Sequence, residues 1–345
     1  SNKRNKKGSG FMGNKESSIR KSSFFTTRKG SRILVMITFM AFPLLLLLVF
    51  TYLPFFRMVQ FSFYDMGYIG KRVFVGLKNY RNVFVRDDCF GALKLSGYYL
   101  VGAFVQLGLA LFFASILSQK MRGGGVFKGL LFFPFLVCGI AVGFIFKFFY
   151  TRGFVLDMVL QWCGFRLEQL PYWLRDTKVN NVSLAATSLW RYMGQNMVLF
   201  IGAISSVDSE LYEAASIDGA NGWQSFKHIT FPGIKTIVVL NMILSISGSL
   251  SVFEPPYVTT GGEFGTATYF VVMDKLAHVS QKVGLASAMA VVLMLLILLV
   301  TGVQKWIEWY FLGTTGRDAQ IEMNRRKKRA RSAGFSGREK VAAES

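Results

Sequence analysis

Six long apolar runs, separated by charged stretches, constrain the fold of this chain more than any other feature. They cover residues 33–56, 95–119, 129–146, 183–207, 236–253 and 283–304, and Arg191 is the one charged residue within them. A helix needs about 20 apolar residues to cross the hydrocarbon core of a bilayer. Because backbone polar groups inside a bilayer must pair within the protein, such runs favour helices. We therefore predict an all-α membrane protein with six transmembrane helices.

The charge content agrees with this prediction. Charged residues make up 17% of the 345 residues, whereas a soluble protein carries about 25%. The first run follows a basic segment, as the apolar region of a signal peptide does, but it is too long for such a region. The bulky residues at 52–56 (Tyr-Leu-Pro-Phe-Phe) offer no small-residue cleavage site, so we expect an uncleaved span.

Lysine and arginine are concentrated at the two ends of the chain. Residues 1–32 hold ten of them and the segment from Lys305 onward holds another ten, whereas the loops on the opposite side hold 13 together. The positive-inside rule then places both termini in the cytoplasm, with basic tails at 1–32 and 313–345. The basic cluster at 325–331 is expected to meet anionic membrane lipid rather than nucleic acid, because it flanks a membrane span.

Several kinds of chemistry are missing from the sequence. No G-x-x-x-x-G-K-[ST] loop occurs, and the glycines at 123–125 lack the spacing that cradles phosphate. There is no Ser/His/Asp or paired-carboxylate arrangement with catalytic spacing, and the two histidines stand alone. The chain is therefore predicted to be no enzyme and to hold no metal or cofactor of its own. Cys138 is expected to pack within the third span, and a disulfide between Cys89 and Cys163 is neither required nor excluded.

The polar segment between the fourth and fifth runs, residues 208–232, has a distinctive order. Glu-Ala-Ala at 213–215 is followed after three residues by Gly219, and after nine more by Ile-Thr-Phe-Pro at 229–232. Asp208 or Ser209 is suited to cap a helix start, and Gly219 is suited to end that helix with a positive φ. Proline at 232 suits the first turn of the next helix. A hairpin at the membrane interface is the plainer alternative.

This pattern resembles the EAA loop of binding-protein-dependent ABC importers, through which a membrane subunit contacts its ATPase. The family motif has Leu where this chain has Phe231. The resemblance implies that ATP and Mg²⁺ are bound by a separate ATPase subunit. Small alanine side chains on one helix face would let that subunit approach closely. The residues expected to contact it are Glu213, Ala214, Ala215, Asp218 and Gly219.

The likeness extends over residues 33–312, which we predict to be the transmembrane domain. Residues 74–80, Phe-Val-Gly-Leu-Lys-Asn-Tyr, are similar to the segment after the first span in carbohydrate ABC permeases of the maltose and glycerol-phosphate type. The family implies half of a translocation pathway for a sugar or oligosaccharide in the bacterial cell membrane. It also implies three kinds of protein partner: a second permease, two ATP-binding subunits and an extracytoplasmic solute-binding protein.

Residues 253–263 are similar to the family segment FDxxYxLTxGGP. This chain departs from it with Glu254 in place of Asp, a stiff Pro-Pro pair at 255–256, and Glu263 in place of Pro. Because the segment is predicted on the outer side, the resemblance implies contact with the solute-binding protein. The residues expected to make it are Tyr257, Thr260, Gly261 and Gly262.

Polar side chains at membrane depth tend to face a cavity or a neighbouring helix. Hydroxyl, amide and aromatic groups facing a cavity would suit a sugar, whereas hydrogen bonding between helices is the alternative for each of them. Arg191 is expected to have a structural partner rather than to bind solute. The candidates for the substrate pathway are Tyr99, Gln106, Trp190, Gln195, Asn196, Asn241, Ser245 and Ser249.

Other functions remain open at this point. Within the same family, the solute is alternatively a polyol or a glycerol-phosphate ester. An ion-coupled secondary transporter would need carboxylates within the spans, and the six runs contain none. A membrane assembly protein that transports nothing would use the 208–232 segment only to bind a partner.

Overall fold

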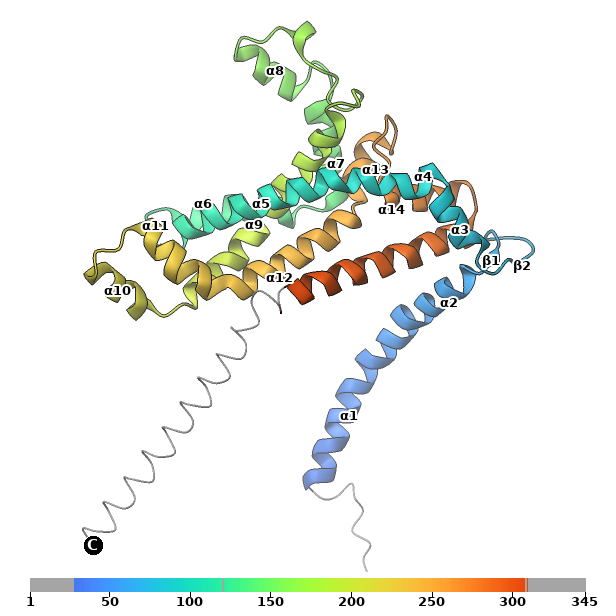
Figure 1. Ribbon diagram of the computed structural model, residues 1–345, viewed down its shortest axis with the longest axis horizontal. Coiled ribbons are helices and arrows are strands. Elements are labelled where there is room, and N and C mark those ends of the chain that lie inside the picture. The colour runs from blue at the N-terminus through green and yellow to red at the C-terminus, as the bar shows by residue number, and fades with distance from the viewer. Residues whose placement is uncertain (1–27, 120, 308, 310–345) are drawn as a thin grey trace, which may run out of the picture. The chain divides into compact units, whose positions relative to one another are not determined.

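The computed structural model describes residues 28–119, 121–307 and 309, and they are mostly helical (Figure 1). The chain divides into two units, Ser1–Arg57 and Met58–Ser345. Strands β1 (Tyr64–Asp65) and β2 (Val73–Phe74) form a short antiparallel pair, in which Tyr64 lies opposite Phe74. The predicted tail at 313–345, and residues 1–27 of the predicted tail at 1–32, lie outside the described residues.

The first unit holds α1 (Arg28–Leu47), the π-helix η2 (Leu48–Tyr52) and the start of α2 (Leu53–Phe61). The wide turn of η2 ends two residues before Pro54, and the same relation recurs where η5 (Phe226–Thr230) ends two residues before Pro232. A proline ring crowds the carbonyl of the preceding turn and lacks an N–H group, so a wider turn in front of it relieves the clash.

The second unit is built mainly of helices. Its elements are α3 (Lys78–Val85), α4 (Asp87–Phe90), η3 (Gly91–Leu95), α5 (Ser96–Leu117), α6 (Gly124–Leu136), α7 (Gly139–Tyr150), α8 (Val155–Trp162), η4 (Leu167–Gln169), α9 (Asn180–Ser205), α10 (Ser209–Ile217), α11 (Gly222–Ser225), η5, α12 (Phe231–Leu250), α13 (Glu254–Thr260), α14 (Tyr269–Asp274), η6 (Lys275–Val279) and a helix at Val283–Ile307.

Four helices in the described ranges are long and apolar enough to cross a membrane: Thr38–Phe61, Asp87–Leu117, Gly222–Thr260 and Val283–Ile307. The pair α6 and α7 counts as a fifth span if it is taken as one. The predicted fourth span corresponds to α9, whose 26 residues are long enough to cross but include many polar side chains. The all-α membrane fold is confirmed, and the count of six spans stays a prediction.

The third predicted span is not one straight helix. The chain bends by 99° between α6 and α7, with Val137 in an extended conformation at the break. Pro134 cannot donate a hydrogen bond within α6, which weakens the helix just before its end. Cys138 lies at this break and is exposed, so the expectation that it packs inside a span was wrong. Cys89 is buried, Cys163 is exposed, and both are free thiols.

Small residues bring the central helices of this unit together. The most extensive contact joins α5 to α9, where Gly102 faces Ala185, and Ala110 and Ala114 are fully buried. Helix α6 also packs on α9, and a Cβ atom placed on Gly194 would overlap the backbone carbonyl of Leu131. Close approach over small residues is a usual way for helices to associate inside a membrane, where the hydrophobic effect gives no driving force.

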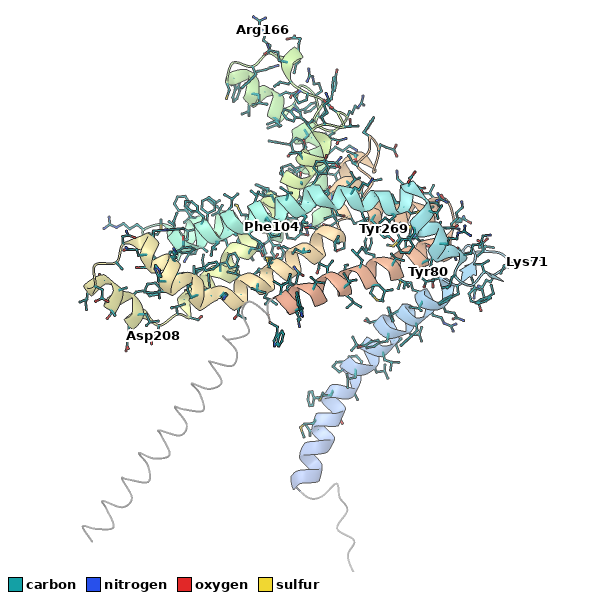
Figure 2. The ribbon with its side chains drawn as sticks, in the orientation of Figure 1. Lys71, Tyr80, Phe104, Arg166, Asp208 and Tyr269 are labelled. Atoms are coloured by element: carbon teal, nitrogen blue, oxygen red, sulfur yellow. The ribbon has the colours of Figure 1, made fainter. Side chains whose placement is uncertain are left out.

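A second core lies beneath α14 and the helix Val283–Ile307. Tyr269, labelled in Figure 2, is fully buried there and its hydroxyl donates a hydrogen bond to the Met289 carbonyl oxygen at 2.9 Å. Buried Cys89 and Leu276 belong to the same cluster. This core packs α4 and α14 against the helix at 283–307.

The loop between α7 and α9, residues 151–179, folds around one buried carboxylate. Asp157 is fully buried and accepts hydrogen bonds from the Gly153 amide and the Trp173 indole nitrogen, each at 2.7 Å. Arg152 lies 4.0 Å from the same carboxylate, donates to the carbonyl oxygens of Leu167 and Leu170, and stacks on Tyr172. The loop, which carries Arg166 (labelled in Figure 2), is therefore an ordered unit.

Candidate functional site

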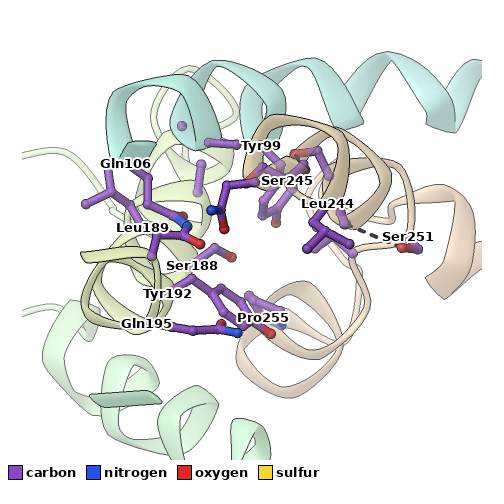
Figure 3. Close-up of a pocket in the computed structure, with 18 of the residues that line it drawn as sticks. Tyr99, Gln106, Ser188, Leu189, Tyr192, Gln195, Leu244, Ser245, Ser251 and Pro255 are labelled. Atoms are coloured by element: carbon purple, nitrogen blue, oxygen red, sulfur yellow. Dashed lines mark hydrogen bonds between the residues drawn. The ribbon is translucent and has the colours of Figure 1, made fainter. Parts of the chain in front are cut away.

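A cavity of about 500 Å³ lies between α5, α9, α12 and the start of α13 (Figure 3). Of the eight residues proposed for the substrate pathway, seven line it and come from three helices: Tyr99, Gln106, Gln195, Asn196, Asn241, Ser245 and Ser249. Sequence positions more than 140 apart thus meet at one place. Their role in a pathway stays a prediction, but the shared wall that it requires is present.

The eighth candidate, Trp190, is not among the lining residues. Its ring packs edge-on against Phe146 of α7, with ring centroids 5.2 Å apart. Position 190 lies on another face of α9 from the cavity residues 188, 192, 195 and 199, which recur at helical spacing. Trp190 therefore contributes to the packing of α7 on α9.

Some polar groups around the cavity have hydrogen-bond partners and others do not. Asn241 donates to the Ile237 carbonyl oxygen at 2.9 Å, and Ser249 donates to the Ser245 carbonyl oxygen at 2.8 Å, so both bond within their own helix. Tyr99 is 3% exposed, and its hydroxyl has no hydrogen-bond partner among the described residues. A buried hydroxyl without a partner is costly unless water or a ligand reaches it. The Tyr99 hydroxyl is therefore an unsatisfied polar group within the described residues.

Sequence reasoning missed several lining residues, among them Ser188, Tyr192 and Glu254. The first two were recoverable, because they lie three or four residues apart along the α9 stripe that contains Gln195. Glu254 was not, because it belongs to a short helix that follows the fifth span and returns to the cavity only in the tertiary structure.

Glu254 forms an ion pair with Arg191 of α9. The Arg191 guanidinium also lies over the Tyr192 ring, 5.1 Å from its centroid. The carboxylate approaches the first residue of α7 so closely that a Cβ atom on Gly139 would overlap it. The expectation that Arg191 has a structural partner is confirmed, and the pair sits where α7, α9 and α13 meet.

The 208–232 segment forms an exposed helix and a turn. Asp208, rather than Ser209, caps α10, accepting a hydrogen bond from the Glu210 amide at 3.1 Å (Figure 2). Gly219 follows the helix with φ +78°, a positive value that glycine adopts without steric cost. Tyr212 and Thr230 share a hydrogen bond of 2.9 Å that ties α10 to the start of the next span.

The residues proposed for ATPase contact lie largely on the open side of this segment. Glu213, Ala214, Asp218 and Gly219 are exposed, and Ala215 is half-buried. Two apolar side chains are unusually open for a helical hairpin, with Ile217 87% and Trp223 70% exposed. Exposed apolar groups next to small residues are typical of an interaction surface.

The four residues proposed for contact with a binding protein differ in exposure. Tyr257 and Gly261 are exposed, Thr260 is half-buried, and Gly262 is buried. Tyr257 stacks on Phe253 with centroids 4.5 Å apart. Thr260 and Thr266 share a hydrogen bond of 2.6 Å, and Gly261 and Gly262 both have positive φ. Of these four residues, Tyr257 and Gly261 are therefore the two with exposed surface.

The sequence matches the family model of the binding-protein-dependent transport system inner membrane component over residues 22–309. The chain belongs to this family. A probable ABC transporter permease, YurN of Bacillus subtilis, is 32% identical over 270 residues, which cover 76% of this chain and 92% of YurN. A probable starch degradation products permease, AmyD of Thermoanaerobacterium thermosulfurigenes, is 27% identical over 277 residues, covering 78% of this chain and 92% of AmyD.

A solved structure shows the same fold as this permease. A bacterial alginate ABC transporter, in complex with a periplasmic protein bound to alginate pentasaccharide, contains a chain that superposes with a TM-score of 0.71. That match covers 83% of the permease and 98% of the transporter chain at 18% sequence identity. The resemblance stated from the sequence is therefore confirmed, both as a family and as an architecture. The permease is a membrane component of a transport system rather than an enzyme.

Proposed function

We propose that this permease forms half of the translocation pathway for a sugar or oligosaccharide in an ATP-driven importer. The observation that carries the proposal is the cavity between α5, α9, α12 and α13, where hydroxyl and amide side chains gather at membrane depth. Such groups match the hydroxyls of a sugar. The relative AmyD, a probable permease for starch degradation products, supports the same class of solute.

The importer would be completed by other chains. A second permease would close the cavity from the other side, two ATPase subunits would bind ATP with Mg²⁺, and an extracytoplasmic solute-binding protein would deliver the sugar. The alginate transporter, whose structure includes a periplasmic protein bound to alginate pentasaccharide, supports the last of these partners. Both termini would lie in the cytoplasm, because Lys and Arg are concentrated at the two ends.

Coupling to the ATPase would occur through residues 208–232. Helix α10 is exposed, is capped at Asp208, and is tied to the start of the next span by the bond between Tyr212 and Thr230. Movement of the ATPase would therefore be passed to α12, which carries Asn241 and Ser245 of the cavity wall. The permease itself would make no covalent change, since its work is to stabilise two conformations differently.

The first test is purification of the tagged permease from its native membrane, followed by ATPase assays with and without candidate solutes. We expect a second permease and an ATPase to copurify, and hydrolysis to rise when the binding protein and an oligosaccharide are added. A polyol or a glycerol-phosphate ester that stimulates instead would name the alternative solute. Transport that proceeds without ATP and depends on an ion gradient would refute the proposal.

The coupling surface has its own test. Ala215→Asp and Gly219→Asp should abolish solute-stimulated uptake while the permease still inserts in the membrane, because each adds a charge to the close-fitting face. Thr177→Asp, which adds the same charge to an exposed position in the loop before α9, is the matched control and should transport normally. Uptake at the wild-type rate in both the Ala215→Asp and the Gly219→Asp variant would refute the coupling assignment.

A further inference from the structure

The cavity wall contains one ionisable acid. Glu254 is the only charged residue among the described residues that line it, and the other polar groups there are hydroxyls and amides. A lone carboxylate facing a sugar site would repel acidic solutes and attract cationic ones. The charge of the solutes that the cavity prefers therefore depends on whether the Glu254 carboxylate is neutralised by a neighbouring group.

Arg191 neutralises that carboxylate. The two groups form an ion pair, in which the Arg191 side chain is 15% exposed and the Glu254 side chain is 41% exposed. The Arg191 guanidinium does not line the cavity itself, whereas Glu254 does. The carboxylate also lies against Gly139 at the first turn of α7, where the partial positive charge of the helix end adds to the compensation. The described part of the wall is therefore electrically close to neutral.

We propose that Glu254 is a specificity-determining residue: by cancelling the charge of Arg191 beside the cavity, it makes this site select uncharged oligosaccharides over acidic ones. The proposal rests on the proposed function, since it assumes that a sugar enters this cavity. If Glu254 lost its charge, the Arg191 guanidinium would remain beside the cavity without compensation. A carboxylate on the sugar would then gain an attraction that the wild-type wall does not offer.

The test uses the whole importer, with both permeases and the ATPases, reconstituted in nanodiscs and assayed without the binding protein, so that only the cavity discriminates. The probes are a radiolabelled malto-oligosaccharide and the same oligosaccharide carrying one glucuronate in place of a glucose. The measured quantity is the ratio of their dissociation constants. We expect the wild type to prefer the neutral probe.

Glu254→Gln keeps the shape of the side chain and removes its charge, so it should shift the ratio toward the acidic probe by about tenfold. Arg191→Gln leaves the carboxylate uncompensated and should shift the ratio the opposite way. The double variant, Glu254→Gln with Arg191→Gln, is the matched control. It breaks the ion pair but restores neutrality, so its ratio should return to that of the wild type, which a purely structural role would not produce.

The outcomes separate the two proposals. If the neutral probe binds but the ratio is the same in all four proteins, the specificity role is refuted and the sugar pathway stands. If neither probe binds the wild type, the sugar pathway fails and the specificity role falls with it. Should Glu254→Gln fail to assemble, the opposite shift of Arg191→Gln and its reversal in the double variant decide the question.

Discussion

Replacing Asp157 with alanine should unfold the loop between α7 and α9 while the membrane helices stay intact. The carboxylate is fully buried and accepts two hydrogen bonds of 2.7 Å, from the Gly153 amide and the Trp173 indole. A hydrogen bond to a charged group contributes about 1.5–3 kcal/mol. The ion pair with Arg152 adds little, because its atoms are 4.0 Å apart and the Arg152 side chain is 26% exposed.

Two such bonds give an expected loss of about 3–6 kcal/mol for Asp157→Ala. Since about 1.4 kcal/mol corresponds to a factor of ten, local opening should become more frequent by about two to four orders of magnitude. The assay is amide hydrogen exchange of residues 151–179 in the nanodisc-embedded importer. Peptides from α5 and the helix at 283–307 serve as the internal reference and should exchange as in the wild type.

The matched control is Glu168→Ala, which removes an exposed carboxylate from the same loop. Surface substitutions of this kind change stability by less than about 0.5 kcal/mol, so exchange should change by no more than about twofold. If Asp157→Ala exchanged no faster than Glu168→Ala, the buried carboxylate would not hold the loop together and the reasoning would be wrong.

Three further predictions concern packing, recognition and pH. Gly194→Ala should lower the Tm of the complex and cost about 1–3 kcal/mol, because its Cβ would overlap the Leu131 backbone, whereas Gly202→Ala in the same helix has open space and should cost nothing. Tyr99→Phe should leave Tm unchanged or raise it, since it removes a buried hydroxyl without a partner among the described residues, yet weaken oligosaccharide binding. The hydrogen bond from Lys275 lowers the pKa of Glu263. The stability that this pair contributes is therefore fully present above the ordinary carboxyl pKa, and it is lost as the pH falls through the lowered pKa of Glu263. The Tm difference between the wild type and Lys275→Met should therefore disappear at low pH, and a constant difference would contradict it.

Several features were predictable because they depend on neighbouring residues alone. The apolar runs located the helices, since their length is fixed by the bilayer rather than by any contact. The cap at Asp208, the turn at Gly219 and the helix start around Pro232 follow from the backbone chemistry of each residue. The polar residues within the apolar runs were recognisable from the sequence, and seven of the eight named from them line the cavity.

Other features depend on pairs of residues far apart in the chain. Gly139, at the bend between α6 and α7, leaves room for Glu254, more than 100 residues away. Arg191 and Glu254 are 63 residues apart, and neither residue type identifies its partner. Trp190 has an aromatic ring of the kind that can stack on a sugar, but in the folded protein this ring packs against Phe146 of α7.

The sequence by itself thus determined which segments form the long apolar helices and where the helix within residues 208–232 begins and ends, because these follow from local periodicity and backbone chemistry. Only the tertiary structure decided that Asp157 is buried inside its loop, that Glu254 is neutralised by Arg191 beside the cavity, and that the third predicted span is broken. The physical reason is that burial and charge compensation are set by which distant groups come into contact, and such contacts exist only once the helices have packed.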